Sequence, residues 1–192
     1  EEGGNRAQYF LGEFDGHTVR QTVPMPGPVL LDAGYDNYAP VSFFGAEQPT
    51  ILGWGSSWVY AHQQPTTDYC GCMTLARTLS LRETPEGLRL CQWPVIPALH
   101  GEAAIRDGGV LPGEVFALKI RAEGAFSAGF ENDSGESFAF GLDEGGQFYT
   151  DRSKAGEHGF SSLYASPMFQ RTEAARLAGG AVEMLVVFDR SI

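Results

Sequence analysis

The feature that most constrains the fold of this chain is the regular spacing of its turn residues, which separate short apolar and aromatic runs along the whole sequence. The 192 residues include 25 Gly and 11 Pro, and Phe, Tyr and Trp make up 12% of them. Gly and Pro favour turns, whereas aromatic and β-branched side chains favour strands. The sequence therefore predicts an all-β protein built from many short strands.

Strand-like runs in the first part of the chain cover residues 9–14, 17–23, 41–44, 50–54 and 73–81. The turn pair Asp15-Gly16 separates the first two, which predicts a hairpin. The prolines of 24–28 are expected to break the sheet there.

The second part has a different rhythm. Residues 115–121 alternate, and further short runs follow at 126–130, 137–142, 147–151 and 181–188, as in a β-sandwich. Only 172–177 hints at a helix. Turn residues at 84–87 separate the two rhythms, so we predict one unit over residues 1–85 and a second over 86–192.

Composition excludes several function classes. The net charge is −11 with only 13 Lys and Arg, which argues against a nucleic-acid partner, because a phosphate backbone needs a basic face. No apolar run approaches the roughly 20 residues of a membrane span. A neutral ligand such as a saccharide fits this charge better. Three cysteines cannot all pair within one chain, which favours a reducing, cytoplasmic compartment, although a cleaved secretion signal is not excluded.

The densest aromatic cluster is residues 54–60, with Trp54, Trp58 and Tyr60 among small residues. Ring faces at the end of a strand can stack on the C–H side of a sugar. The alternative is that these tryptophans belong to the core.

A second cluster contains Asp32, Asp36 and Tyr38 around a glycine. Ionised carboxylates accept several hydrogen bonds and can bind sugar hydroxyls. The alternative is that these acids only stabilise a loop, through turns in which the Asp side chain binds the backbone.

Metal and cofactor sites are not expected. Cys70, Cys72 and Cys91, with His62 and His100, match no zinc-ligand spacing, and buried thiols are the favoured interpretation. The sequence contains no nucleophile-elbow, phosphate-loop or dinucleotide motif, so no cofactor is predicted.

Taken in order, these segments resemble glycoside hydrolase family 32, which contains invertases, levanases, inulinases and sucrose-6-phosphate hydrolases. The resemblance rests on residues 9–16 (YFLGEFDG), 32–39 (DAGYDNYA), 53–61 (GWGSSWVYA) with Pro65-Thr66, 73–81 (MTLARTLSL), 92–95, 151–156 and 188–192. The blocks cover nearly the whole chain. Asn37 stands where the family has Phe, Gly55 to Ser57 and Ala76 depart from the usual residues, and Cys70 and Cys72 replace a usual Arg and Gln.

The resemblance implies a fold in which residues 1–85 are the last blades of a five-bladed β-propeller and the rest is an incomplete β-sandwich. It implies retaining hydrolysis of fructosides, with an Asp nucleophile and a Glu acid/base. The family motifs that carry these groups are absent, so we expect no catalytic residue here, both edges to be cuts through a larger protein, and this chain alone to be inactive. By the same resemblance, Asp32, Asp36, Tyr38 and Trp54 contact the substrate.

Two other functions are compatible with the sequence. One is a fructan-binding module that does not cut, and the other is a purely structural or oligomer-forming piece. Because a propeller cut through its blades exposes apolar edges, we expect the isolated chain either to form homo-oligomers or to rearrange its first 85 residues.

Overall fold

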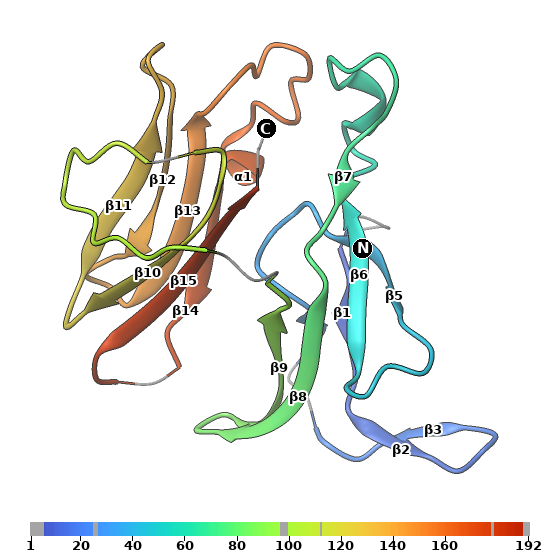
Figure 1. The fold of residues 1–192 in the computed structure, drawn as a ribbon. Coiled ribbons are helices and arrows are strands. Elements are labelled where there is room, and N and C mark those ends of the chain that lie inside the picture. Colours follow the sequence, from blue (N-terminus) through green and yellow to red (C-terminus); the bar gives the residue numbers. More distant parts are fainter. Residues whose placement is uncertain (1–5, 25–26, 97–99, 112, 178, 190–192) are drawn as a thin grey trace.

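The protein is nearly all-β, as the sequence predicts. The computed structural model describes residues 6–24, 27–96, 100–111, 113–177 and 179–189. Strands β1 to β9 lie on one side, strands β10 to β15 on the other, and the short helix α1 (Pro167–Gln170) lies among the latter (Figure 1). The propeller-and-sandwich arrangement and the boundary at residue 85 stay predictions. Part of the expected sheet break falls on residues 25–26, and the expected cut edges of the chain fall on residues 1–5 and 190–192. These residues lie outside the part of the chain that the structure describes.

The hairpin expected at Asp15-Gly16 is confirmed. Strand β2 (Gly12–Phe14) pairs antiparallel with β3 (Val19–Gln21). The Asp15 carboxylate accepts the backbone N–H groups of His17 and Thr18, both at 2.8 Å, and these bonds hold the turn. The run 9–14 is divided, however, because β1 (Gln8–Tyr9) pairs instead with β4 (Val29–Leu30).

The main sheet of the first part has the order β5-β6-β8-β9, with β7 also paired to β6. Its strands are β5 (Tyr38–Ser42), β6 (Thr50–Gly55), β7 (Cys72–Met73), β8 (Arg77–Thr84) and β9 (Gly87–Pro94). A single 3₁₀ turn (Ala61–Gln63) lies in the connection from β6 to β7. The turn residues at 84–87 join β8 to β9 in continuous register, so this sheet extends to Pro94.

The second part contains two sheets. One has the order β11-β12-β13-β14, and β10 pairs with β15 in the other. The strands are β10 (Val115–Ala122), β11 (Phe126–Glu131), β12 (Ser137–Leu142), β13 (Gln147–Lys154), β14 (Arg171–Ala175) and β15 (Val182–Asp189). Phe116 and Phe188 of one sheet contact Phe130 of the other, at centroid distances of 5.4 and 5.6 Å. Aromatic side chains therefore pack the two sheets together.

The helix hint at 172–177 is wrong. Residues 171–175 form β14, which pairs antiparallel with β13, and the hydroxyls of Thr150 and Thr172 lie 2.6 Å apart across this pair. Cross-strand pairing thus overrides the helix propensity of the alanines.

An aromatic cluster joins the two parts of the chain. Tyr60, from the segment after β6, is 1% exposed, and its ring lies 5.0 Å from Tyr164 and 5.5 Å from Phe169. Tyr35 lies 4.8 Å from the same Phe169. These contacts fix the loop before β5 against the elements around α1, where the candidate site lies.

Large apolar side chains are also exposed on the first part, among them Phe10, Phe14, Val41, Phe44 and Trp93. Within the described residues, no helix is long and apolar enough to cross a membrane.

Candidate functional site

Asp32 holds the loop between β4 and β5. Its carboxylate accepts the backbone N–H of Gly34 at 3.1 Å, the side-chain amide of Asn37 at 2.7 Å and the guanidinium of Arg77 at 2.8 Å. The bond to Gly34 is the turn contact named above as the alternative interpretation. Asp32 thereby ties the loop to the first residue of β8.

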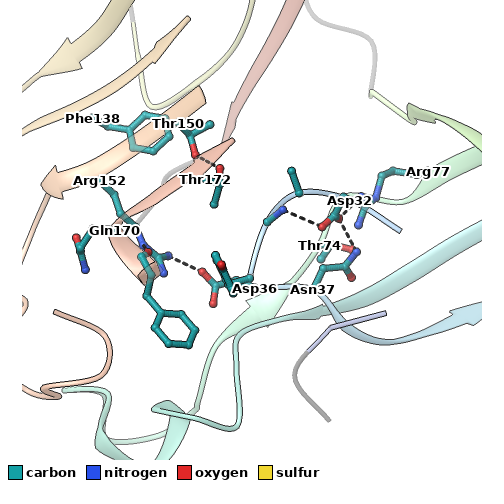
Figure 2. Close-up of a pocket in the computed structure, with 14 residues that line it drawn as sticks. Asp32, Asp36, Asn37, Thr74, Arg77, Phe138, Thr150, Arg152, Gln170 and Thr172 are labelled. Carbon is teal, nitrogen blue, oxygen red and sulfur yellow. Dashed lines mark hydrogen bonds and ion pairs between the residues drawn. The ribbon is translucent and has the colours of Figure 1, made fainter. Parts of the chain in front are cut away.

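Asp36 connects the loop to the second part of the chain. Its carboxylate accepts hydrogen bonds from the Tyr60 hydroxyl and from the Arg152 guanidinium of β13. Arg152 also donates to the Phe169 carbonyl at 2.8 Å and to the Tyr60 oxygen at 3.3 Å. In Figure 2, Asp36 and Arg152 point toward one another from opposite sides of the cavity. We call this ion pair the junction pair.

The surroundings of the junction pair are apolar on the side of Tyr164. The Arg152 guanidinium carbon lies 4.5 Å above the Tyr164 ring centroid, a cation–π geometry. Burial raises the pKa of the Tyr164 hydroxyl above its ordinary value, the nearby Arg152 charge lowers it, and the Asp36 charge raises it. Tyr164 therefore stays neutral at physiological pH and supplies a face to the cation.

A cavity of about 400 Å³ lies between the loop and strands β13 and β14. One wall carries Asp32, Asp36 and Arg77, and the facing wall carries Phe138, Thr150, Arg152, Gln170 and Thr172 (Figure 2). The two carboxylates are balanced by the two guanidinium groups. We call this space the junction cavity.

Two amide oxygens of residues that line the junction cavity are unsatisfied. Asn37 is 5% exposed and Gln170 is 7% exposed, and neither side-chain oxygen has a hydrogen-bond donor among the described residues. The Asn37 oxygen faces Gly53, where any Cβ atom would collide with it. Buried acceptors of this kind normally bind a donor, which a water or a ligand hydroxyl could supply.

Trp54 lies on a different surface. It is opposite Tyr38 of β5 and opposite Met73 of β7, so the three side chains share one face of the sheet. The indole N–H of Trp54 donates to the Cys70 carbonyl at 2.8 Å, and its ring lies 4.9 Å from that of Trp58. We call Tyr38, Trp54 and Trp58 the aromatic platform. Trp58 is 52% exposed, so the core interpretation does not hold for it.

The predicted site residues thus occupy two places. Asp32 and Asp36 line the junction cavity, whereas Tyr38 and Trp54 are not among the residues that line it. Sequence reasoning did not assign roles to Arg77 and Arg152, although both lie within blocks quoted for the resemblance. It grouped Tyr60 with the rings that could stack on a sugar, whereas Tyr60 is 1% exposed and binds Asp36 instead. The arginines in the blocks 73–81 and 151–156 were the available signal for partners of the two acids.

The thiols differ from the expectation of burial. Cys70, in a bend, and Cys72, in the short strand β7, are exposed, and Cys91 of β9 is partly exposed. In the part of the chain that the structure describes, no group of three or more His, Cys, Asp or Glu could hold a metal ion.

Comparisons with known proteins agree on one family. The family model "Glycosyl hydrolases family 32 N-terminal domain" matches residues 1–94. A levanase of Bacillus subtilis is 29% identical over 98% of this chain and 31% of its own length. An extracellular exo-inulinase of Meyerozyma guilliermondii is 31% identical over 87% of this chain and 37% of its own length. The chain thus spans about a third of the length of these relatives.

Solved structures share the fold. A fructofuranosidase variant from Schwanniomyces occidentalis, complexed with fructosylnystose, matches 97% of this chain with a TM-score of 0.76 and 21% identity. The match covers 43% of that protein. The likeness includes both parts of the chain described above.

Proposed function

Because the chain belongs to glycoside hydrolase family 32, we propose that it is part of a β-fructofuranosidase-type hydrolase. The complete protein releases fructose from sucrose, sucrose-6-phosphate or a fructan, with retention of configuration. The observation that carries this proposal is the levanase match, which runs through 98% of the chain and therefore includes both parts.

Retaining hydrolysis needs a free nucleophilic carboxylate and a carboxylic acid about 5 Å away from it. Asp32 and Asp36 do not fit these roles, because each is ion-paired with an arginine and accepts further hydrogen bonds. Their oxygens are already engaged by these donors, so neither carboxylate is free to attack a sugar carbon. We therefore assign the catalytic Asp and Glu to another part of the complete protein.

This chain contributes a wall of the substrate site. The Trp54 ring is held by its bond to the Cys70 carbonyl and by Trp58, so it offers a face of fixed orientation to a fructosyl ring. Tyr38, directly opposite in β5, adds a hydroxyl on the same face. Asp32 and Asp36 line the junction cavity rather than this face, and a sugar hydroxyl that enters the cavity would donate to those carboxylate lone pairs that the contacts described above leave unused.

The test uses the complete protein encoded by the reading frame that contains this chain. Fructose release from sucrose, levan and inulin is measured for wild type, Trp54→Ala and Trp93→Ala. Loss of stacking in Trp54→Ala is expected to lower kcat/KM at least about 10-fold, since 1.4 kcal/mol is a factor of ten. Trp93 is 63% exposed on β9, so its replacement is the matched control and leaves kcat/KM near wild type. Unchanged kcat/KM in Trp54→Ala overturns the platform assignment, and absence of fructose release by wild type overturns the activity.

A fructan-binding module without catalysis is the second candidate. The exposed Trp58 ring, which contacts Trp54, and the ion-paired state of both aspartates favour it. Under this hypothesis the complete protein binds levan or inulin saturably in calorimetry and releases no fructose.

The cytoplasmic location expected from the cysteines stays a prediction, and two of the relatives are named extracellular exo-inulinases.

A further inference from the structure

A pair of thiols lies directly beside the aromatic platform. Cys70 and Cys72 are separated by one glycine, and both are exposed. The chain bends at Cys70 and Gly71, and Gly71 has a φ of 71°, in the left-handed region. Neither side chain takes part in the junction cavity or in the stacking of Trp54.

The backbone here suits a bond between the two sulfurs. Consecutive Cα atoms are about 3.8 Å apart, so a bent three-residue segment brings its first and last Cα atoms within the roughly 4.4–6.8 Å of disulfides. Exposure gives a small thiol or disulfide reagent access to both side chains. Cys91, on β9, lies in another strand pair, opposite Ser80.

We propose that Cys70 and Cys72 form a redox-active dithiol, which a low-molecular-weight disulfide oxidises to an intrachain disulfide. The thiolate of one cysteine attacks the reagent, forms a mixed disulfide and releases one reagent thiolate. The second cysteine thiolate then attacks the protein sulfur of the mixed disulfide and expels the other reagent thiolate. Two protein S–H groups become one S–S bond, and the reagent disulfide takes up the two electrons and two protons as two thiols.

The bond acts on Trp54 through the backbone. The ring that it closes contains the Cys70 carbonyl carbon, and the Cys70 oxygen is the acceptor of the Trp54 indole N–H at 2.8 Å. Closure also draws the Cys72 sulfur away from the Gly55 carbonyl, which it now faces at 3.8 Å. Gly71 packs closely beside the indole, since a Cβ atom at this position would lie only 2.7 Å from the indole nitrogen. We therefore expect ring closure to shift the Cys70 carbonyl relative to the indole and to break the Trp54 hydrogen bond.

The primary test counts thiols in the folded chain after equilibration with oxidised glutathione. Cys91→Ser leaves two thiols of the three, and both are expected to disappear together while the intact mass falls by two hydrogens. Cys70→Ser and Cys72→Ser, each combined with Cys91→Ser, lack the second thiol and are expected to keep one glutathione adduct. Near-UV circular dichroism checks the fold of every variant. Stable adducts on both cysteines of Cys91→Ser, disulfide-linked dimers on a non-reducing gel, or unreacted thiols each overturn the proposal.

The coupling to Trp54 is measured by tryptophan emission during the same oxidation. In Cys91→Ser a red shift is expected on oxidation and reversal with dithiothreitol, and in Cys91→Ser with Trp54→Phe the shift is lost. A shift that persists without Trp54 refutes the coupling but leaves the dithiol. If the proposed function is correct, the oxidised form is also expected to bind fructan more weakly. The thiol count and the emission shift do not depend on the proposed function.

Discussion

Replacing Arg152 by Met tests whether the junction pair joins the two parts of the chain. Met keeps much of the aliphatic volume but removes the ion pair with Asp36, the bond to the Phe169 carbonyl and the cation–π contact with Tyr164. Removing one partner of an ion pair costs about 0–1 kcal/mol at the surface and about 3–5 kcal/mol when buried.

The junction pair lies between these limits, since the side chains of Arg152 and Asp36 are 23% and 28% exposed. We take about 2 kcal/mol for the lost ion pair and about 1 kcal/mol for the carbonyl and ring contacts together. The free energy of unfolding is therefore expected to fall by about 3 kcal/mol. At this chain length the melting temperature falls by about 6–12 °C.

Urea unfolding followed by tryptophan emission measures this loss, with Arg171→Met as the matched control. Arg171 also pairs with a carboxylate, Glu173 at 2.8 Å, and lies 4.2 Å from the Tyr149 ring centroid, but its side chain is 38% exposed. The control is expected to lose no more than about 1 kcal/mol. Equal losses in the two variants refute the reasoning. A loss in Asp36→Asn/Arg152→Met that equals the sum of the single losses refutes the direct pairing.

Three further predictions concern other features of the chain. Gly71→Ala is expected to lower the free energy of unfolding in urea by about 2–4 kcal/mol, because the new Cβ would lie 2.5 Å from the Cβ of Ser56. Gly135 has a φ of 78° and open space around it, so Gly135→Ala is the control and is expected to cost about 1 kcal/mol. Equal costs in the two variants contradict the packing argument. The Ser153 hydrogen bonds lower the pKa of the Asp151 carboxyl. Asp151→Asn is therefore expected to lower the free energy of unfolding by its full amount above about pH 4, and by progressively less as the pH falls through the lowered folded-state pKa. Unfolding curves from pH 2 to 7 measure this difference, and a difference that does not depend on pH contradicts the prediction. Because large side chains such as Phe44 are exposed on the first part, light scattering is expected to show oligomers of the isolated chain, whereas a strictly monomeric, fully ordered chain contradicts the expectation.

Local signals in the sequence were sufficient for most strands and for the first hairpin. The Asp15 turn could be predicted because its hydrogen bonds reach only His17 and Thr18. Strand β14 was missed because its alternation is weak and its pairing with β13 is a tertiary contact. Strand β9 was missed because the turn that precedes it was taken as a boundary.

The candidate site was less predictable than the strands. The cluster of Asp32 and Asp36 is visible in the sequence, and both acids do line one cavity. Their arginine partners are 45 and 116 residues away, however, and no local pattern specifies which cation meets which acid. The assignment of Tyr38 and Trp54 to the substrate came from the family resemblance and stays a prediction.

The distance in sequence between Asp36 and Arg152 also affects the order of events during synthesis. Asp36 leaves the ribosome long before Arg152 has been added to the chain. During that interval the loop lacks Arg152, one of its two guanidinium partners. Arg77, which binds Asp32, arrives much earlier. During translation the Asp32 end of the loop is therefore fixed first, and the junction cavity closes only after β13 has left the exit tunnel.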